Sequence, residues 1–365
     1  MVKRKLLLAL CVLIVIGYLI VGLWPFEFNP DNRVIWLGNG EGIALSHPSI
    51  LYSEKPVDLR NGGGSVSVEI CLRPAEEPAW GFTKILSLSE ESVHRNLFVA
   101  QRGKDLWLQL PIWDKGRWNA YDQVWVKGAL QRGVRRFVAV TAGTEGTDFY
   151  VDGVLARSYP KLKPRPSVLR GYVVLGGIGS GNRNWEGRLY GAAIFDRTLS
   201  ASDIGRHYSL WSGDERRKIA EEEGLSALYF FNEKGGSVIR DYGPAGATMR
   251  IGAKYELRDR SVFPALWRGG YSRVDIAINL LGFVPFGFCY FLYRKRTYPG
   301  RLWGNIFVTL IIAAAVSATI ETLQIWLPVR SPSYLDLICN ISGAAGGIFL
   351  TLTHADKTPT HAEKI

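Results

Sequence analysis

The sequence predicts a membrane α plus all-β protein: a four-helix transmembrane bundle with an extracytoplasmic antiparallel β-sandwich inserted between spans 1 and 2. Three observations predict it. Four apolar stretches are free of charge for long enough to cross a bilayer, which takes around 20 helical residues for about 30 Å of hydrocarbon. Basic residues cluster beside alternating span ends. Between the first two spans, apolar and polar residues alternate with the period of β-strands.

The expected spans are residues 6–26, 276–293, 302–320 and 337–353, and the third is prolonged to 329 with Glu321 as its only charge. Basic residues precede the first span and fill the loop after the second: Lys3, Arg4, Lys5, Arg294, Lys295, Arg296 and Arg301. Such residues mark the cytoplasmic side. Both termini are therefore expected in the cytoplasm and residues 27–273 outside the cytoplasmic membrane.

The first span has two interpretations. A basic segment before an apolar run is also the form of a cleaved signal peptide. The run is long, however, and no small-x-small cleavage site precedes the WPFEFNPDN segment. An uncleaved anchor is therefore expected.

The net charge of +11 does not predict a nucleic-acid partner, because the basic residues lie at cytoplasmic span ends or are scattered through the exported segment. Orientation and contact with anionic lipid headgroups explain them. Of the four cysteines, only Cys71 lies in the exported segment, so no disulfide can form within it. Its stability must come from packing.

The exported segment has the signals of a sandwich. From 65 to 72, valine, isoleucine and leucine alternate with Ser65, Ser67, Glu69 and Cys71, which is typical of a half-buried strand. Similar runs occupy 137–141, 149–151 and 172–175, and DFYVDGVLAR predicts a hairpin with Asp152 and Gly153 at the turn. Many short strands between glycine and proline turns indicate two packed sheets.

The runs RRFVAVTAGTEGTDFYVDGVLARS and NWEGRLYGAAIFDRTLSASDIGRHY resemble the second half of a laminin G-like, concanavalin A-like lectin/glucanase domain. The YVDG hairpin, the W-x-G-x-[IL] strand and the DRxLSxxDI ending carry the resemblance, which extends from 64 to 211. It implies a jelly roll of two antiparallel sheets, and it fixes no ligand. Residues 214–223 are expected to be a charged linking helix or a solvated spacer, before strands of the kind that accompany such domains.

Carbohydrate binding by this domain would need exposed aromatic rings. The segment PIWDKGRWNAYDQVWV supplies Trp113, Trp118, Tyr121 and Trp125. Rings offer sugars an apolar surface, and Asp114 and Asp122 could hold hydroxyl groups or a calcium ion. The alternative is packing, the usual role of tryptophan, and we expect Trp107 in the core or on a sheet face. No other cofactor is predicted.

One polar pattern, DxxxNxxG, occurs twice in the spans: Asp275, Asn279 and Gly282, then Asp336, Asn340 and Gly343. These positions share one helix face. Polar groups in hydrocarbon are costly and therefore suggest function. The repeat favours two related helical hairpins, spans 1 and 2 against 3 and 4, with chance similarity as the alternative.

The segments NLLGFVPFG and IETLQIWLPVRSPSYLDLICNISGAAGG resemble the VanZ-like family of small membrane proteins. The matching positions are Asn279, Phe283, Pro285, Gly287, Glu321, Gln324, Arg330, Asp336, Asn340, Gly343, Ala344 and Gly347. The chain departs from simpler members by an insertion of about 240 residues after the first span. The resemblance implies a link to resistance against glycopeptide antibiotics of the teicoplanin type.

Three hypotheses concern the expected intramembrane polar cluster of Arg273, Asp275, Asn279, Glu321, Gln324, Arg330, Asp336 and Asn340. In the structural one, carboxylates pair with arginines and small residues pack closely. In the second, arginines hold the phosphate of a lipid or lipid-linked sugar. In the third, Glu321 is a general acid or base oriented by Asp336. The HExxH, CxxC and GxSxG motifs are absent and the histidines are scattered, so an enzyme is not favoured.

The sequence thus predicts five parts: a span and its exit (1–30), a laminin G-like sandwich (31–212), a linker with accessory strands (213–262), a VanZ-like domain with three spans (263–355) and a cytoplasmic tail (356–365). The favoured function is recognition of glycan, lipid-linked glycan or protein at the outer face of the cytoplasmic membrane, in polysaccharide handling or glycopeptide tolerance. The alternative is a membrane-embedded enzyme acting on a lipid phosphate. Transport is a weaker option, because four spans rarely enclose a path without forming a homo-oligomer.

Overall fold

The chain divides into two compact units. A computed structural model describes residues 2–355 except 39, 79–80, 90–96, 115–116, 178–183, 257–272, 328–329 and 331, and the side chains of 2–3, 113–120, 273 and 354–355 lie outside the description. One unit contains Met1–Phe28 and Ser261–Ile365, and the other contains Asn29–Arg260. The β-rich unit is therefore inserted after the first helix of the helical unit, as the alternation of residues predicted.

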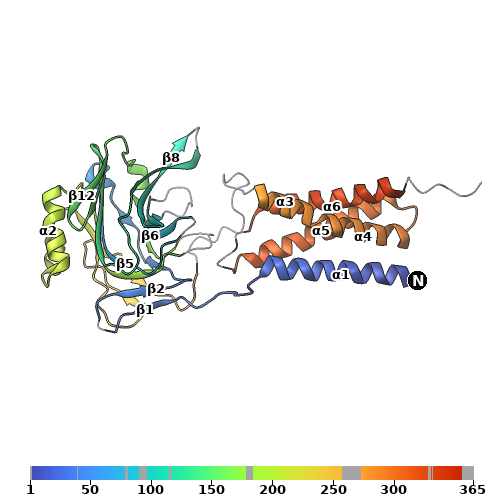
Figure 1. The fold of residues 1–365 in the computed structure, drawn as a ribbon, viewed down its shortest axis with the longest axis horizontal. Helices are drawn as coiled ribbons and strands as arrows, with labels where there is room; N and C mark the ends of the chain where they lie inside the picture. Colours follow the sequence, from blue (N-terminus) through green and yellow to red (C-terminus); the bar gives the residue numbers. More distant parts are fainter. Residues whose placement is uncertain are drawn as a thin grey trace, which may run out of the picture. The chain divides into compact units, whose positions relative to one another are not determined.

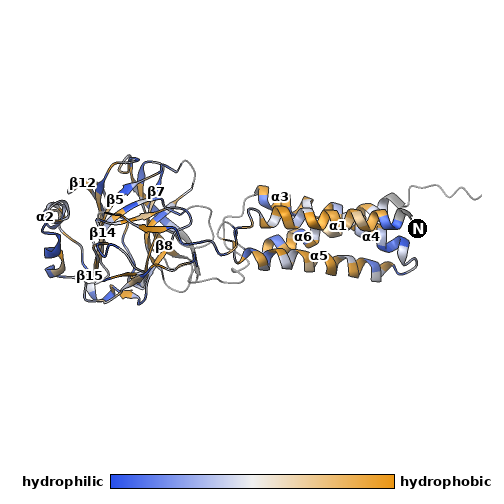
Figure 2. Cartoon of the chain, turned by 90° about the horizontal axis from the view of Figure 1, so that it is seen from below, coloured by the Kyte–Doolittle hydropathy of each residue, from blue (hydrophilic) through white to orange (hydrophobic). Residues whose placement is uncertain are grey.

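The helical unit contains α1 (Val2–Leu23), α3 (Arg273–Gly282), α4 (Val284–Thr297), α5 (Leu302–Gln324) and α6 (Tyr334–Ala355). In the described part of the chain, four helical segments are long and apolar enough to cross a membrane: Arg4–Leu23, Val274–Thr297, Leu302–Gln324 and Tyr334–Thr353. Their hydrophobic colouring distinguishes them from the sandwich in Figure 2. The four predicted spans are confirmed as helices, and the second consists of α3 followed by α4.

The second span is interrupted at Phe283. Pro285 stands in the first turn of α4, where its missing N–H costs nothing, but it cannot continue the hydrogen bonding of α3. Tyr18 of α1 donates its hydroxyl to the Gly282 carbonyl at 2.5 Å, and its ring stacks on Phe283 at 4.5 Å. Helix α1 therefore supports the interruption with both a hydrogen bond and an aromatic contact.

Small residues bring α6 against α3 and α4. A Cβ atom on Gly343 would lie 2.0 Å from the Leu280 carbonyl oxygen, and one on Gly347 would lie 2.2 Å from that of Val284. Close approach through glycine is a common way for membrane helices to pack. Gly282 differs, because a Cβ there would meet no heavy atom within 4 Å. The two glycines of the repeated pattern are therefore not equivalent.

In the described residues, the sandwich has an eight-stranded and a nine-stranded sheet (Figure 1). The first contains, in spatial order, β1 (Val34–Trp36), β2 (Ile43–Leu45), β14 (Gly187–Phe195), β5 (Val66–Pro74), β10 (Arg136–Gly143), β11 (Gly146–Val151) and β12 (Val154–Tyr159), with β15 (Leu225–Tyr229) on β14. The second contains β16 (Val238–Ile239), β17 (Met249–Arg250), β3 (Leu51–Ser53), β13 (Arg170–Leu175), β6 (Thr83–Ser89), β7 (Leu97–Arg102), β8 (Asp105–Asp114) and β9 (Arg117–Val126), with β4 (Val57–Asp58) on β13. All of these pairs are antiparallel.

The main core lies between the two sheets. Inward side chains of β5, such as Val68 and Ile70, belong to one buried cluster with residues of β6 and β13. At the hairpin between β11 and β12, Asp152 and Gly153 have φ angles of 50° and 81°, the left-handed pair that a tight two-residue hairpin turn requires. The expected hairpin and the strands around it are therefore present.

The prediction that β5 is half buried is wrong. Its outward residues Ser67, Glu69 and Cys71 are also buried, because helix α2 (Ala201–Ser212) and neighbouring segments cover this side of the sheet (Figure 1). Alternation of polar and apolar residues indicated one solvated face. The polar residues instead face a second, smaller core.

The residues after α2 belong to the sandwich itself. Strand β15 pairs with β14 and β17 pairs with β3, so the expected accessory strands extend the two sheets. The charged segment forms a short 3-10 helix, η3 (Arg216–Glu221), whose residue Ile219 is buried. Two further 3-10 turns are η1 (Arg60–Gly62) and η2 (Pro166–Val168).

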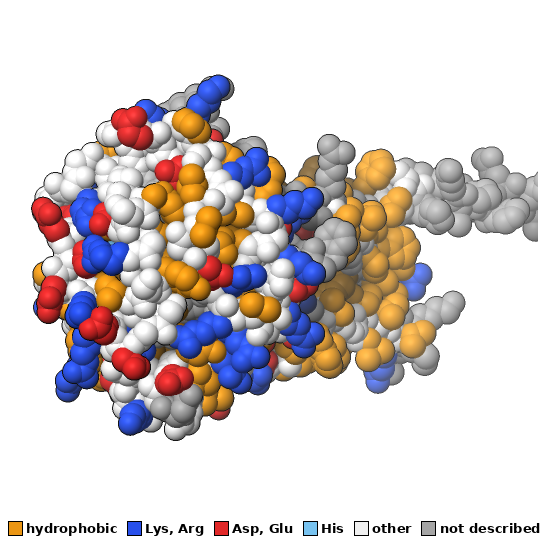
Figure 3. Space-filling model, turned by 60° about the vertical axis from the view of Figure 1, so that its left-hand side comes forward, with side chains coloured by type: hydrophobic (Ala, Val, Ile, Leu, Met, Phe, Trp, Pro, Cys, Tyr) orange, Lys and Arg blue, Asp and Glu red, His pale blue; other side chains and the backbone are white. Residues whose placement is uncertain are grey.

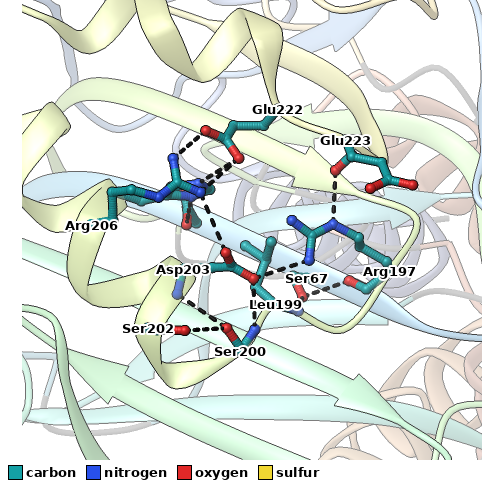
Figure 4. A network of polar contacts seen from close by, with 11 residues as sticks. Ser67, Arg197, Leu199, Ser200, Ser202, Asp203, Arg206, Glu222 and Glu223 are labelled. Atoms are coloured by element: carbon teal, nitrogen blue, oxygen red, sulfur yellow. Dashed lines mark hydrogen bonds and ion pairs between the residues drawn. The ribbon is translucent and has the colours of Figure 1, made fainter.

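The DRxLSxxDI sequence anchors α2 (Figure 4). Ser200 and Asp203 form a reciprocal capping box at its N-terminus, and Arg197 donates to the Asp203 carboxylate at 3.0 Å. Burial would raise the pKa of Asp203, but the Ser200 backbone and side chain and Arg197 hold it well below its usual range. Ser67 of β5 donates to the Arg197 carbonyl at 2.7 Å, so this motif has a structural role.

Candidate functional site

The polar cluster of the helical unit is built around the start of α6. The Glu321 side chain of α5 is only 4% exposed, and its Oε2 accepts a hydrogen bond from the backbone N–H of Ser333 at 2.7 Å. The Ser333 hydroxyl in turn accepts from the N–H groups of Leu335 and Asp336 at 3.2 and 3.3 Å. A serine cap and a carboxylate are both favoured at a helix N-terminus, where N–H groups lack partners.

Asp336 links Glu321 to a third carboxyl group, Asp275. The Asn279 amide donates a hydrogen bond to the Asp336 carboxylate. Asp336 interacts electrostatically with both Asp275 and Glu321. The first DxxxNxxG segment on α3 is therefore joined to the second on α6, and through Asp336 to Glu321 on α5.

The remaining members of the expected cluster contact other groups. Gln324 donates to the Gly22 carbonyl at 2.8 Å, and Arg330 donates to the Val21 carbonyl at 3.2 Å. These carbonyls lie in the last turn of α1, where no intrahelical donor is available. Asn340 donates instead to the Ser317 hydroxyl at 2.9 Å. The Arg273 side chain lies outside the described residues.

This arrangement limits the possible chemistry. In the described residues, no ion pair joins Arg330 to a carboxylate, and no group of three His, Cys, Asp or Glu side chains is placed to hold a metal. What remains is a row of carboxyl and amide groups from α3, α5 and α6. Such a row can accept hydrogen bonds from hydroxyl groups or hold a shared proton.

The sandwich carries the second candidate site on the hairpin of β8 and β9. Trp107 and Trp125 are register partners, and their rings stack with centroids 4.5 Å apart and planes 17° apart. Trp107 is buried, whereas Trp125 is 36% exposed. Phe82 lies edge-on to Trp107 at 5.0 Å, and the Tyr159 hydroxyl donates to the Trp125 carbonyl at 2.5 Å. We call these four residues the aromatic platform.

Two arginines border the aromatic platform. The Arg157 guanidinium lies 5.9 Å from the Trp125 ring and 4.9 Å from that of Tyr159. The Arg102 guanidinium lies 5.9 Å from the Trp107 ring. Sequence reasoning assigned Trp107 to packing and missed its partnership with Trp125, because the register of the hairpin was not known.

The other predicted sandwich residues have separate positions. Tyr121 packs at 5.5 Å on Phe98 rather than on the aromatic platform. Asp122 is exposed on β9. The side chains of Trp113, Asp114 and Trp118 lie outside the described residues, so calcium at the aspartate pair stays a prediction.

Basic side chains do not dominate the face of the sandwich drawn in Figure 3, where acidic and hydrophobic side chains are interspersed with them. Several arginines of this unit are paired with carboxylates, including Arg136 with Asp152 at 2.5 Å and Arg170 with Asp58 at 3.8 Å. On this face of the sandwich, basic and acidic side chains are therefore mixed.

Two family models match the chain. Residues 38–205 match the concanavalin A-like lectin/glucanases superfamily, and residues 237–354 match the VanZ/LLP1 family. Comparison with curated proteins gives no significant match.

Solved structures resemble the sandwich. The carbohydrate-binding module CBM40 of the Ruminococcus gnavus IT-sialidase, bound to α2,3-sialyllactose, has 16% identity, a TM-score of 0.36, and coverage of 46% of this chain and 95% of its own. The heptameric SAP-like pentraxin of Limulus polyphemus has 13% identity, a TM-score of 0.37, and coverage of 61% and 95%. The NanB sialidase of Streptococcus pneumoniae has 13% identity, a TM-score of 0.34, and coverage of 41% and 26%.

The expected combination of two resemblances is thus confirmed within one polypeptide. The helices supply four segments fit to span a bilayer, and the inserted unit has the two antiparallel sheets of the lectin-like fold. This chain therefore combines a VanZ-like domain with a laminin G-like domain similar to the concanavalin A-like superfamily, and it has four helical segments long and apolar enough to cross a membrane.

Proposed function

We propose that this protein recognises glycans at the outer face of the cytoplasmic membrane through the aromatic platform of its sandwich, while its helices anchor it in the bilayer. The observation that carries the proposal is the exposed Trp125 ring stacked on Trp107. The proposed orientation, with both termini cytoplasmic, rests on the basic residues beside the span ends.

The aromatic platform has the physical properties that sugar binding needs. A stacked pair of indoles offers a flat apolar surface to the C–H face of a sugar ring. Its rings are held in place before binding, so little side-chain entropy is lost when a ligand arrives. Arg157 beside the ring supplies N–H donors for hydroxyl groups. In the described part of the sandwich, β9 is the last strand of its sheet, and the Tyr159 hydroxyl bonds the N–H and the carbonyl of Trp125 there, which fixes the backbone that carries the exposed ring.

A glycan array tests the proposal with the full chain in a neutral detergent. We expect a set of glycans that bind wild type and bind Trp125→Ala about tenfold more weakly, which corresponds to the loss of roughly 1.4 kcal/mol of stacking. Tyr242→Ala is the matched control, because Tyr242 is exposed to a similar extent, 40% against 36%, and lies outside the aromatic platform. Equal binding by Trp125→Ala and wild type would contradict the proposal. A complete absence of glycan binding would favour a protein ligand.

The second candidate function is catalysis on a lipid phosphate or lipid-linked substrate, and the grouping of Glu321, Asp336 and Asp275 favours it. A buried carboxyl group can transfer a proton to or from a reacting oxygen. Purified protein would be incubated with labelled phospholipid and lipid-linked sugars, and Glu321→Gln would be compared with wild type. Turnover that is lost in a variant that still accumulates would support catalysis, whereas failure of the variant to accumulate would support a structural role.

A cellular assay connects these functions with the envelope. Deletion of the gene is expected to change surface polysaccharide or tolerance to a teicoplanin-type glycopeptide. Restoration by wild type and by Glu321→Gln, but not by Trp125→Ala, would attribute the phenotype to glycan recognition. The reverse pattern would attribute it to the helical unit.

A further inference from the structure

A cavity of about 710 Å³ opens on the sandwich, away from the aromatic platform. Its lining includes Glu41, Arg73, Gly133, Arg135, Arg188 and Tyr190. The arginines come from β5, from the residue before β10 and from β14, three adjacent strands of the eight-stranded sheet. We call this cavity the arginine pocket.

Arg73 and Arg188 are direct register partners on β5 and β14. Their neighbours Leu72 and Leu189 are buried in the core between the sheets, so the arginine side chains project from the opposite face. Like charges directly opposite each other weaken a pair of strands. A pair of arginines at these positions therefore lowers the stability of the free sandwich unless an anion is present.

The three arginines of the pocket have no acidic partner among the described residues. Within the residues that the structure describes, no ion pair joins Arg73, Arg135 or Arg188 to a carboxylate. By contrast, Arg136, next to Arg135 in the chain, is paired with Asp152. The guanidinium groups of the pocket are thus available to a ligand.

The pocket floor holds one arginine in place. The Arg135 guanidinium lies 4.2 Å from the centroid of the Tyr190 ring. Tyr190 is 8% exposed and belongs, with Cys71, to the second, smaller core on the outward face of β5. Stacking on a fixed ring orients the planar guanidinium and leaves its N–H edge free for bonding. The ligand therefore meets a partly organised set of donors.

We propose that the arginine pocket binds the acidic group of a saccharide, either a sugar carboxylate or a sugar phosphate. Guanidinium groups bind both anions with two parallel hydrogen bonds. The volume lies in the usual range for small-molecule sites, about 300–1,000 Å³, and exceeds what a bare ion needs. Glu41 at the pocket adds a negative charge, which disfavours a continuous polyanion such as nucleic acid.

This site is independent of the proposed platform function. Trp125 lies on β9 of the nine-stranded sheet, whereas Arg73 and Arg188 lie in the eight-stranded sheet. Trp125→Ala is therefore expected to leave binding at the arginine pocket intact. A failure of glycan binding at the aromatic platform can therefore be distinguished from a failure of acidic-sugar binding at the arginine pocket.

Isothermal titration of the full chain in nanodiscs of zwitterionic lipid tests the inference. The probes are glucuronic acid, glucose 1-phosphate, glucose and inorganic phosphate. Binding of either acidic sugar, at least about tenfold tighter than glucose, is expected, since charge-assisted hydrogen bonds distinguish the ligands. Comparison of the two acidic sugars identifies the anionic group. Equal affinity for glucose, or inorganic phosphate binding as tightly as both acidic sugars, would overturn the proposal.

Variants locate the site. Arg188→Gln and Arg73→Gln are expected to weaken binding of the acidic sugar about tenfold each, and Arg188→Lys is expected to recover only part of it, because lysine cannot form the bidentate contact. Arg240→Gln is the matched control, since this exposed arginine lies outside the pocket and its loss changes net charge equally. Unchanged binding in Arg188→Gln, or an equal loss in Arg240→Gln, would refute the assignment.

Discussion

The buried carboxylate of Glu69 gives the sharpest test of how α2 is held on the sandwich. Its Oε1 atom lies 2.7 Å from Nδ1 of His207, and its Oε2 atom accepts from Nε1 of Trp211 at 2.9 Å. All three side chains are buried. Glu69→Leu keeps a similar volume but leaves the Trp211 N–H and the His207 ring nitrogen without this partner.

The expected cost follows from the two lost contacts. Each buried polar group that is left unsatisfied costs about 1–3 kcal/mol, so Glu69→Leu should lower the free energy of unfolding by roughly 2–6 kcal/mol. For a domain of this size, each kcal/mol shifts the midpoint by about 2–4 °C. The measurement is thermal unfolding of the full chain in detergent, followed by tryptophan fluorescence.

A second substitution separates hydrogen bonding from packing. In the Glu69→Leu background, Trp211→Phe removes one unpartnered donor, so its cost should be smaller than in wild type by about 1–3 kcal/mol. Glu69→Gln is expected to be milder, because its amide can still pair with one or both rings. A midpoint for Glu69→Leu within about 2 °C of wild type, or full additivity with Trp211→Phe, would refute this reasoning.

Three further predictions concern the helices and the response to pH. Gly343→Ala should reduce the amount of protein that accumulates in the membrane, because its Cβ atom would lie 2.0 Å from the Leu280 carbonyl oxygen. Gly282→Ala should accumulate normally, because the space around Gly282 is open. Immunoblotting of membrane fractions measures both amounts. Gln324→Ala removes the donor to the Gly22 carbonyl and should lower the free energy of unfolding by about 1–3 kcal/mol, measured by thermal unfolding in detergent. Burial lowers the pKa of His207, but Glu69 and Glu222 raise it overall, so this contribution to stability is complete below about pH 6.5 and is lost as pH rises through the raised pKa. His207→Gln should flatten that decline in thermal unfolding across roughly pH 6–9.

Local pattern was sufficient for much of the fold. Uncharged length predicted the four spans, since only a helix can satisfy its backbone within hydrocarbon. Glycine at the turn of DFYVDGVLAR predicted the hairpin, because both central residues need positive φ. The burial of Glu69 could not be predicted in this way, since the helix that covers it lies more than 130 residues later in the chain.

The candidate sites could likewise be predicted from the sequence only in part. The sequence pattern suggested that Asp275, Asn279 and Asp336 belong to one polar cluster. In the structure Asp336 interacts with both other residues. Spacing did not show that Gln324 and Arg330 contact the end of α1. It also did not pair Trp107 with Trp125, because a register shift of one residue would have placed the two rings on opposite faces.

The sequence by itself determined which segments are long and apolar enough to cross a membrane, which form strands and which residue types carry polar chemistry. These properties depend on neighbours within a few residues. Tertiary structure alone decided that Arg73 of β5, Arg135 just before β10 and Arg188 of β14 border one cavity, and that two tryptophans of one hairpin form a surface. Such sites depend on strand order and register, which are set by the packing of distant segments.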